Sequence, residues 1–293
     1  MLIIVLVHID DCTIVGKSQV LVERFKAEIQ KHVDITDMGN LHWILGNKFC
    51  HIPQEKRLIL SQKAYIKAIL WQYGFEDLKP TATPMDPAIQ LSTTQSPLMT
   101  EEYAVMKHVP YHEAVRSLMY ATLGTCPDIC YAVQTISKFN MKPRLAHWEA
   151  VKRIFRYLIG TKDLWLSYGS LTKELQGYAD ADGSMNEDHK AISGYAFMIN
   201  GGSVLWSAKR QELISLSTTE SEYIAVTQAA KEALWLHSLI SQLLALLYIL
   251  PLYFPTISLQ LHLQKNTNTM PIQNISTSNF ISFDGSLKKA KYV

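Results

Sequence analysis

Two adjacent aspartates near the amino terminus, Asp10 and Asp11, lie between the strongly apolar runs 2–9 and 12–15. Like charges repel each other in a poorly solvated place, so such a pair is costly unless a cation neutralises it. Two Mg²⁺ ions held by carboxylates about 3.5–4 Å apart can stabilise the attacking and leaving oxygens of phosphoryl transfer. Asp-Asp is also a common turn composition. The pair therefore predicts a metal site or an ordinary hairpin turn, and the apolar flanks favour the metal site.

A second set of acidic residues lies in the carboxyl-terminal half. The segment GYAD ends a predicted strand at Asp180, and Glu222 falls in the first turns of a predicted helix. Ser217 and Glu220 have the spacing of a capping box, in which the glutamate accepts a hydrogen bond from a backbone N–H at the helix start. That assigns Glu220 a structural role, and Asp182 is assigned to a turn or the surface.

Residues 144–160 form a predicted helix that carries a basic and aromatic face. Lys152, Arg153 and Arg156 lie there beside the aromatic residues Trp148, Phe155 and Tyr157. A face of this kind can bind a phosphate backbone. The alternative is an ordinary amphipathic helix with a solvated charged side, and the sequence slightly favours this alternative.

The composition limits the class of protein. With 293 residues, 48% of them hydrophobic, the chain can bury a core and is long enough for two modules. A net charge of +2 indicates no dominant partner, so partners must be inferred from local stretches. The four cysteines lack the spacing of a zinc knuckle or a redox motif. We therefore expect a reduced intracellular protein, in the cytoplasm or the nucleus.

Two apolar runs could suggest a signal sequence or a membrane span. The run at the amino terminus has no basic residues before it and leads directly into Asp10. The second run, residues 243–254, is too short to cross a bilayer and contains Pro251. We expect no membrane segment.

Hydrophobic periodicity predicts helices and strands in separate stretches, which indicates an α+β fold. The proline-rich residues 79–110 predict a linker that contains the boundary between two modules. A hairpin turn is expected at Gly201-Gly202. Helices are predicted at residues 18–32, 62–73, 111–123, 128–139, 144–160 and 218–247, and strands at 2–9, 12–15, 43–46, 58–60, 175–181, 193–199 and 203–208.

The order of motifs along the chain resembles that of one family. LVHIDDCTIVGKS is similar to the polymerase-site hairpin of reverse transcriptases, in which an aromatic-x-Asp-Asp turn closes the palm. Later motifs resemble, in the same order, the Pol polyprotein of copia-type LTR retrotransposons. They are DMGNLHWILGNKF, LSQKAYIKAIL, PYHEAVRSLMYATLGTCPDICYAV, HWEAVKRIFRYLIGT, GYADAD and SGYAFMINGGSVLWSAKRQELISLSTTESEYIA. The resemblance covers about residues 2–253.

The resemblance implies a division of the chain. Residues 1–85 match the carboxyl-terminal part of a reverse transcriptase, with parts of its palm and thumb, and residues 86–110 a linker. Residues 111–172 match a helical connection, and residues 173–253 part of an RNase H-like α/β sheet. The implied cofactor is Mg²⁺, and the implied partner is an RNA–DNA hybrid or another nucleic acid.

The resemblance also assigns the acidic residues. Asp10 and Asp11 match the paired polymerase carboxylates, and Asp180 and Glu222 match two RNase H ligands. His8 stands where the family has a tyrosine that packs near the primer terminus. The third polymerase carboxylate is expected on a strand upstream of the first residue. The further RNase H carboxylates belong to the motifs [S/C]DNQSA and KHID, which do not occur after residue 253.

Residues 254–293 differ from the rest of the chain, because they are rich in Asn, Thr, Ser and Gln and lack periodicity. With permitted codon choices, a shifted reading frame yields SDNQSA and KHID in family order. We hypothesise that this tail is out of frame and disordered, with the missing carboxylates encoded across Pro255/Thr256 and Ser276/Thr277. The RNase H-like sheet would then lack its parallel strand. The nucleotide sequence tests the hypothesis.

Functions from two classes follow from these observations. The first is a pseudogene-like fragment of an RNA-directed DNA polymerase with RNase H, inactive because both carboxylate sets are incomplete. The second is a non-catalytic nucleic-acid-binding module that uses Lys152, Arg153 and Arg156, and salt-dependent binding would test it. A third possibility is that the reading frame yields no stable protein.

Overall fold

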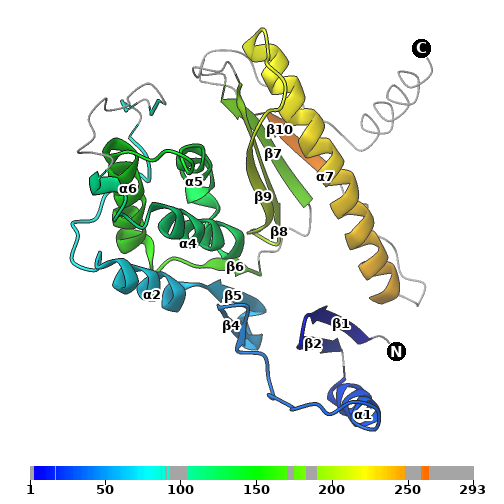
Figure 1. Ribbon diagram of the computed structural model, residues 1–293. Coiled ribbons are helices and arrows are strands. Elements are labelled where there is room, and N and C mark those ends of the chain that lie inside the picture. The colour runs from blue at the N-terminus through cyan, green and yellow to red at the C-terminus, as the bar shows by residue number, and fades with distance from the viewer. Residues whose placement is uncertain are drawn as a thin grey trace, which may run out of the picture.

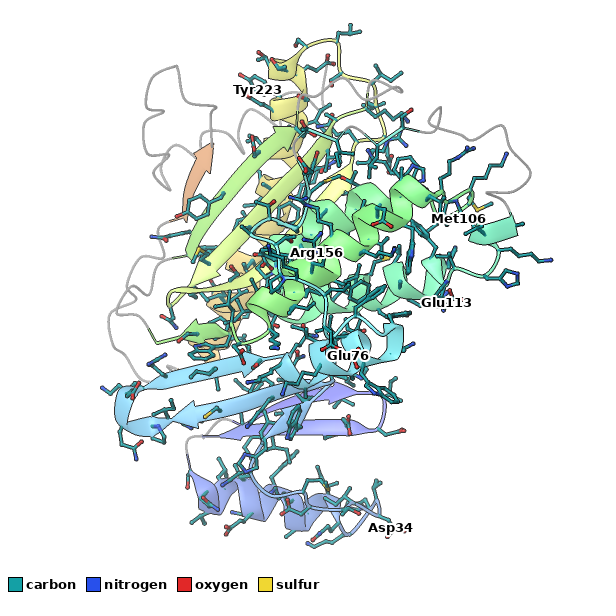
Figure 2. The ribbon with its side chains drawn as sticks, turned by 90° about the vertical axis from the view of Figure 1, so that its left-hand side faces the viewer. Asp34, Glu76, Met106, Glu113, Arg156 and Tyr223 are labelled. Carbon is teal, nitrogen blue, oxygen red and sulfur yellow. The ribbon has the colours of Figure 1, made fainter. Side chains whose placement is uncertain are left out.

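The computed structural model describes residues 3–16, 18–86, 88–89, 91–92, 104–169, 175–182, 190–247 and 259–263. It combines helices with three separate β-sheets, which confirms the predicted α+β class. In Figure 2, Asp34 lies at the foot of the view, Glu76, Glu113 and Arg156 lie at mid-height, and Tyr223 lies at the top. Among the described residues, no helix is long and apolar enough to cross a membrane.

The first sheet is a hairpin of two antiparallel strands, β1 (Ile3–His8) and β2 (Asp11–Gly16). Its turn is Ile9-Asp10, whereas the sequence predicted Asp10-Asp11. Asp11 instead begins β2, opposite His8, because a two-residue turn leaves it paired in the ladder. Ile9 has a φ of 53°, a strained conformation for a β-branched residue. Helix α1 (Gln19–Ile29) contacts β2.

The second sheet joins segments that are far apart in the sequence. Strands β3 (Trp43–Ile44), β4 (Asn47–Ile52) and β5 (Arg57–Ser61) are antiparallel neighbours. The 3₁₀ turn η1 (Pro53–Glu55) connects β4 to β5. The fourth strand, β6 (Leu166–Tyr168), pairs with β5 although it lies more than a hundred residues further along the chain.

The main core lies among helices α2 (Lys63–Tyr73), α4 (Tyr111–Gly124), α5 (Cys130–Ser137) and α6 (Leu145–Thr161), with the 3₁₀ turn η2 (Pro127–Ile129) before α5. These helices agree with the predicted ranges, and Gly74 ends α2 with a φ of 67° as expected of a C-cap. Large buried side chains of the core are Tyr111, Leu118, Ile136, Ile154, Phe155 and Leu158.

The predicted module boundary within residues 79–110 does not separate two cores. Ile66, Ile69 and Leu70 of α2 belong to the same buried cluster as the helices that follow the proline-rich stretch. Strand β5, which precedes the proline-rich stretch, also pairs with β6, which follows it, so both sides of the stretch share one sheet. The prediction was wrong because a proline-rich composition excludes helix and strand without excluding a fixed path along a neighbouring helix.

The third sheet contains β7 (Leu175–Asp182), β8 (Ile192–Ile199), β9 (Gly202–Arg210) and β10 (Leu259–Leu263), in the order β10-β7-β8-β9. The β8–β9 turn is Asn200-Gly201, one residue earlier than predicted, since both residues have positive φ. The long helix α7 (Thr218–Leu247) packs on β7 and β8 (Figure 1). The core between this sheet and α7 comprises Leu175, Ala179, Phe197, Ala229, Ala233 and Leu236.

The expectation that this sheet lacks a parallel strand was wrong. Leu259–Leu263 pairs in parallel with β7, and Leu263 lies opposite Ala179. The segment LQLHL alternates apolar and polar residues, the period that a strand requires, and β7 has a free edge to receive it. The remainder of the tail, with the Pro255/Thr256 and Ser276/Thr277 positions, lies outside the described residues.

Helices α2, α4, α5 and α6 form a helical unit. This unit and strand β6 of the second sheet are joined to the third sheet along β9. The indole Nε1 of Trp206 donates to the Thr122 carbonyl at 2.7 Å, and the Tyr168 hydroxyl donates to the Ser203 carbonyl at 2.6 Å. The Tyr168 ring lies against Gly202, where a Cβ would come within 2.6 Å of it. Figure 1 shows α5 beside β9 at this junction.

Candidate functional site

Asp10 and Asp11 lie at the exposed end of the β1–β2 hairpin. Between residues 3 and 61, no residue that the structure describes is buried. The apolar side chains beside the aspartates are among the most exposed, with Val7 at 69% and Ile9 at 84%. The hairpin therefore carries both carboxylates at its exposed end, and no buried side chain fixes the position of its two faces.

Asp180 is the sixth residue of β7 and is exposed. Side chains alternate along a strand, so Asp180 lies on the face opposite that of Leu175 and Ala179, which pack under α7. Partial desolvation raises the pKa of the Asp180 carboxyl. The Ala181 N–H lowers it, and the negative charge of Asp182 raises it further.

Ser217 and Glu220 close the start of α7 as the sequence predicted, except that Glu220 bonds the N–H of Leu216 instead of that of the capping Ser217. The Glu220 N–H donates to the Ser217 hydroxyl at 3.1 Å, and the Glu220 carboxylate accepts from the Leu216 N–H at 2.7 Å. Glu220 therefore has a structural role. Glu222, half-buried in the following turn, is free of that role.

A buried glutamine that the sequence analysis missed ties this helix start to the sheet. Gln211 donates through Nε2 to the Ser193 hydroxyl at 2.9 Å and to the Ser221 carbonyl at 2.8 Å. Ser193 is paired with Ala181, next to Asp180, while Ser221 precedes Glu222. The network brings the segments that carry the two predicted ligands to the same end of the sheet. A polar residue directly after a strand was its only signal in the sequence.

The fit of these residues to Mg²⁺ is incomplete. Carboxylate oxygens are the donors that Mg²⁺ prefers, and it favours near-octahedral oxygen coordination. Among the residues that the structure describes, no three His, Cys, Asp or Glu side chains are grouped closely enough to hold a metal ion. We therefore assign no catalytic step to a metal here.

Comparison with known proteins supplies the family. Residues 1–87 match the family model described as reverse transcriptase (RNA-dependent DNA polymerase). The chain is 41% identical over 242 residues to the retrovirus-related Pol polyprotein from transposon TNT 1-94 of Nicotiana tabacum, which covers 82% of the chain. The chain belongs to the copia-type transposon Pol polyproteins.

Other relatives extend this result. The Pol polyprotein from transposon RE2 of Arabidopsis thaliana is 34% identical over 248 residues, 83% of the chain. The chain spans only 18% and 16% of the lengths of these two Pol polyproteins. It spans 92% of an uncharacterised mitochondrial protein of Arabidopsis thaliana, with 31% identity over 233 residues. No solved structure matches the chain.

In this member of the Pol family, Asp182 has a defined partner. It was assigned to a turn or the surface, but it is the last residue of β7 and accepts a hydrogen bond from the Tyr131 hydroxyl at 2.6 Å. Tyr131 lies on α5, so the bond crosses from the helical unit to the sheet. Sequence spacing gave no signal for a contact between residues 51 positions apart.

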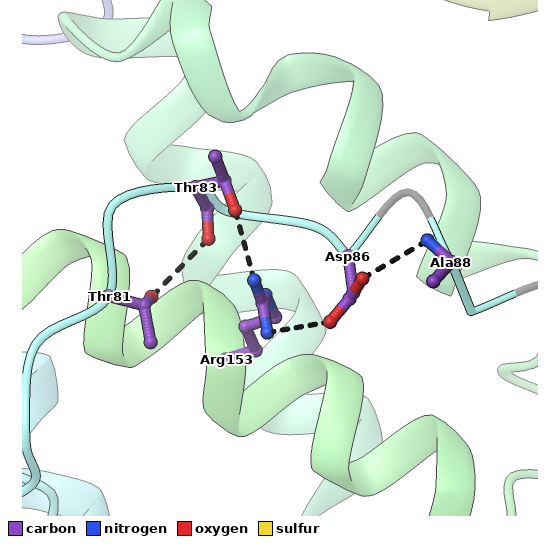
Figure 3. A network of polar contacts seen from close by, with 5 residues as sticks. All are labelled: Thr81, Thr83, Asp86, Ala88 and Arg153. Carbon is purple, nitrogen blue, oxygen red and sulfur yellow. Dashed lines mark hydrogen bonds and ion pairs between the residues drawn. The ribbon is translucent and has the colours of Figure 1, made fainter.

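The basic residues of α6 are engaged within the chain. Lys152 pairs with Glu149 at 2.8 Å. Figure 3 shows Arg153 held between Asp86, at 3.2 Å, and the Thr83 hydroxyl, at 3.0 Å. Arg156 donates through Nε to the carbonyl of Lys79 at 2.7 Å, and the Thr81 N–H donates to the Arg156 carbonyl at 3.3 Å.

These contacts fasten residues 79–86 along α6. The guanidinium of Arg153 already donates to the Asp86 carboxylate and the Thr83 hydroxyl, so part of its charge and of its donor capacity is used within the chain. The structure therefore favours the ordinary interpretation of this helix for Arg153 and Arg156. Binding of nucleic acid by Lys152, Arg153 and Arg156 stays a prediction.

Proposed function

We propose that this chain contributes carboxylates to two nucleic-acid-processing centres of a Pol polyprotein. Asp10 and Asp11 belong to the reverse-transcriptase centre, and Asp180 and Glu222 belong to an RNase H-like centre. We further propose that the chain alone catalyses neither DNA synthesis nor hybrid cleavage, and that Mg²⁺ binds these carboxylates only when further ligands complete the sets.

The third sheet carries the RNase H-like assignment. Three consecutive antiparallel strands are followed by a helix and by a strand parallel to the first of them. The first strand bears Asp180, and the helix bears Glu222 beside the buried Gln211 network. This order of elements is the one that the resemblance leads us to expect, with β10 in the place of the parallel strand.

The composition of β10 supports the proposed lack of cleavage. A further carboxylate is expected on the strand next to Asp180, but none of the five residues of β10 is acidic. Two-metal hydrolysis needs carboxylates that clamp both the attacking and the leaving oxygen. Asp180 and Glu222 supply half of such a set, in accord with the incomplete grouping among the described residues.

Activity assays on the purified chain test this proposal. Primer extension on an RNA template and cleavage of a labelled RNA–DNA hybrid are measured with Mg²⁺ and with Mn²⁺. We expect neither product. Hybrid cleavage that Asp180→Asn abolishes and Asp34→Asn retains would overturn the inactivity, and primer extension that Asp11→Asn abolishes would overturn it for the polymerase centre.

The nucleotide sequence tests the proposed frame of residues 254–293. We expect the shifted frame to encode the two missing motifs in order. A shifted frame without them would refute the out-of-frame origin and leave LQLHL as the native parallel strand.

A further inference from the structure

The face of the third sheet that carries Asp180 is the face on which α5 lies. Asp180 is paired with Gly194, and Gly194 with Ala208, in one row across the strands. The thiol of Cys130, the first residue of α5, takes part in a hydrogen bond with the backbone of Ala208. Helix α5 therefore lies on the sheet face that carries Asp180, next to β9.

The next row on the same face is polar at both ends. Asp182 is paired with Ile192, and Ile192 with Arg210, so an aspartate and an arginine lie two strands apart, about 10 Å between backbones. The Tyr131 hydroxyl reaches Asp182 at 2.6 Å. This row lies one side-chain repeat from the row of Asp180.

Lys138 reaches the same place from the end of α5. It is the C-cap of the helix and lies seven positions after Tyr131, which places both residues on one helix face. The pKa of Lys138 is lowered, because burial disfavours the ammonium and the charge of Arg210 opposes it. Asp182 offsets part of this effect. The two cations are therefore near enough to interact, in a half-buried position.

We propose that Lys138 and Arg210 bind the phosphate backbone of the nucleic acid that enters the Asp180 site. The inference rests on the proposed RNase H-like function, and it makes the helical connection part of the substrate-binding surface. A phosphodiester beside the two side chains could accept hydrogen bonds from both cations, in addition to the charge that Asp182 already supplies to Lys138. Contacts of this kind are independent of base sequence.

A neighbouring cation serves as a matched control. Lys209 precedes Arg210 in β9 and therefore lies on the other face of the sheet, paired with Ser193 in the ladder and with Glu212 at 3.8 Å.

Binding of an RNA–DNA hybrid of defined length tests the inference. Fluorescence anisotropy of the full chain is measured in EDTA at several salt concentrations, so that catalysis is not needed. We expect Lys138→Gln and Arg210→Gln each to weaken binding on the order of tenfold and to reduce the salt slope by about one. Lys209→Gln should bind as the unchanged chain does.

Each outcome separates the two proposals. Equal binding by Lys138→Gln, Arg210→Gln and the unchanged chain would overturn the inference and leave the proposed function standing. No binding by the unchanged chain at low salt would overturn the proposed nucleic-acid function together with the inference. Thermal melting checks that each variant folds. If Arg210→Gln does not, Lys138→Gln against Lys209→Gln decides.

Discussion

The two carboxylate-bearing strands of this chain differ in how much structure supports them. Asp11 begins the second strand of a two-stranded hairpin, in a region where no described residue between 3 and 61 is buried. Asp180 lies on an inner strand of a four-stranded sheet, backed by α7 and flanked by α5. An isolated two-stranded hairpin is marginally stable in water, whereas more strands packed on a helix are stable. Packing against helices therefore fixes the position of Asp180, whereas no such packing fixes the position of Asp11.

Because of this difference, apolar residues beside an acidic motif do not by themselves show that the motif lies in packed structure. The apolar flanks of Asp10 and Asp11 predicted buried strands, yet Val7 is 69% exposed. Apolar strands of this kind need a further surface to cover them. The chain spans under a fifth of the length of the two Pol polyproteins to which it is similar.

The largest expected effect comes from removing a buried side chain between the third sheet and α7. Phe197 is fully buried between β8 and α7, so Phe197→Ala should lower the free energy of unfolding by about 3–5 kcal/mol. Val7→Ala on the hairpin should change it by less than about 0.5 kcal/mol. Urea denaturation followed by circular dichroism measures both. Equal effects would mean that the hairpin is as well packed as the sheet.

Two glycines of the third sheet differ in the room that they leave for a Cβ atom. A Cβ at Gly177 would lie 2.5 Å from the Phe197 ring, whereas one at Gly194 would meet its nearest atom at 3.8 Å. Gly177→Ala should therefore destabilise by about 1–3 kcal/mol through overpacking. Gly194→Ala, in the neighbouring strand, should be tolerated. The same denaturation experiment compares them, and a tolerated Gly177→Ala would contradict the close approach.

Two tyrosines test whether the helical unit supports the strand of Asp180. Tyr131 donates to Asp182 and Tyr157 donates to Asp128, each at 2.6 Å, but only the first bond crosses to the sheet. Each Tyr→Phe change should cost about 1 kcal/mol. Hydrogen exchange should accelerate at residues 180–182 in Tyr131→Phe alone. Unchanged exchange there would show that α5 does not support β7.

The smallest effect concerns two aspartates whose pKa values move in opposite directions. Asp37 lies in the range 3–61, where no described residue is buried, and the Lys26 ammonium and the Gly39 N–H lower its pKa below 3.8. Partial desolvation raises the pKa of Asp180 above 3.8. Stability from Asp37 is lost as pH falls through its lowered pKa. For Asp180 the folded chain holds the proton more tightly, so stability falls as pH rises from 3.8 through its raised pKa. Carboxyl NMR titration measures both, and a reversed order would refute the assigned environments.

Local sequence patterns predicted most elements correctly. The helices of the core, the cap at Gly74 and the capping box of Glu220 follow from spacing and from backbone hydrogen-bonding needs. The hairpin turns were predicted one residue late. Turn position depends on which residues adopt positive φ, and Ile9, a residue type that rarely does so, gave no warning.

The sequence alone determined the family motifs, the order of the elements and the identity of the four predicted ligands, because these depend on residue types and local periodicity. The tertiary structure decided which segments meet. It joined α2 to the later helices, attached residues 79–86 to α6 and brought Tyr131 to Asp182. It also separated the two acidic motifs, since only the strand of Asp180 has a packed sheet and helices to position it. Such long-range contacts depend on how complementary surfaces bury area together, which no local spacing encodes.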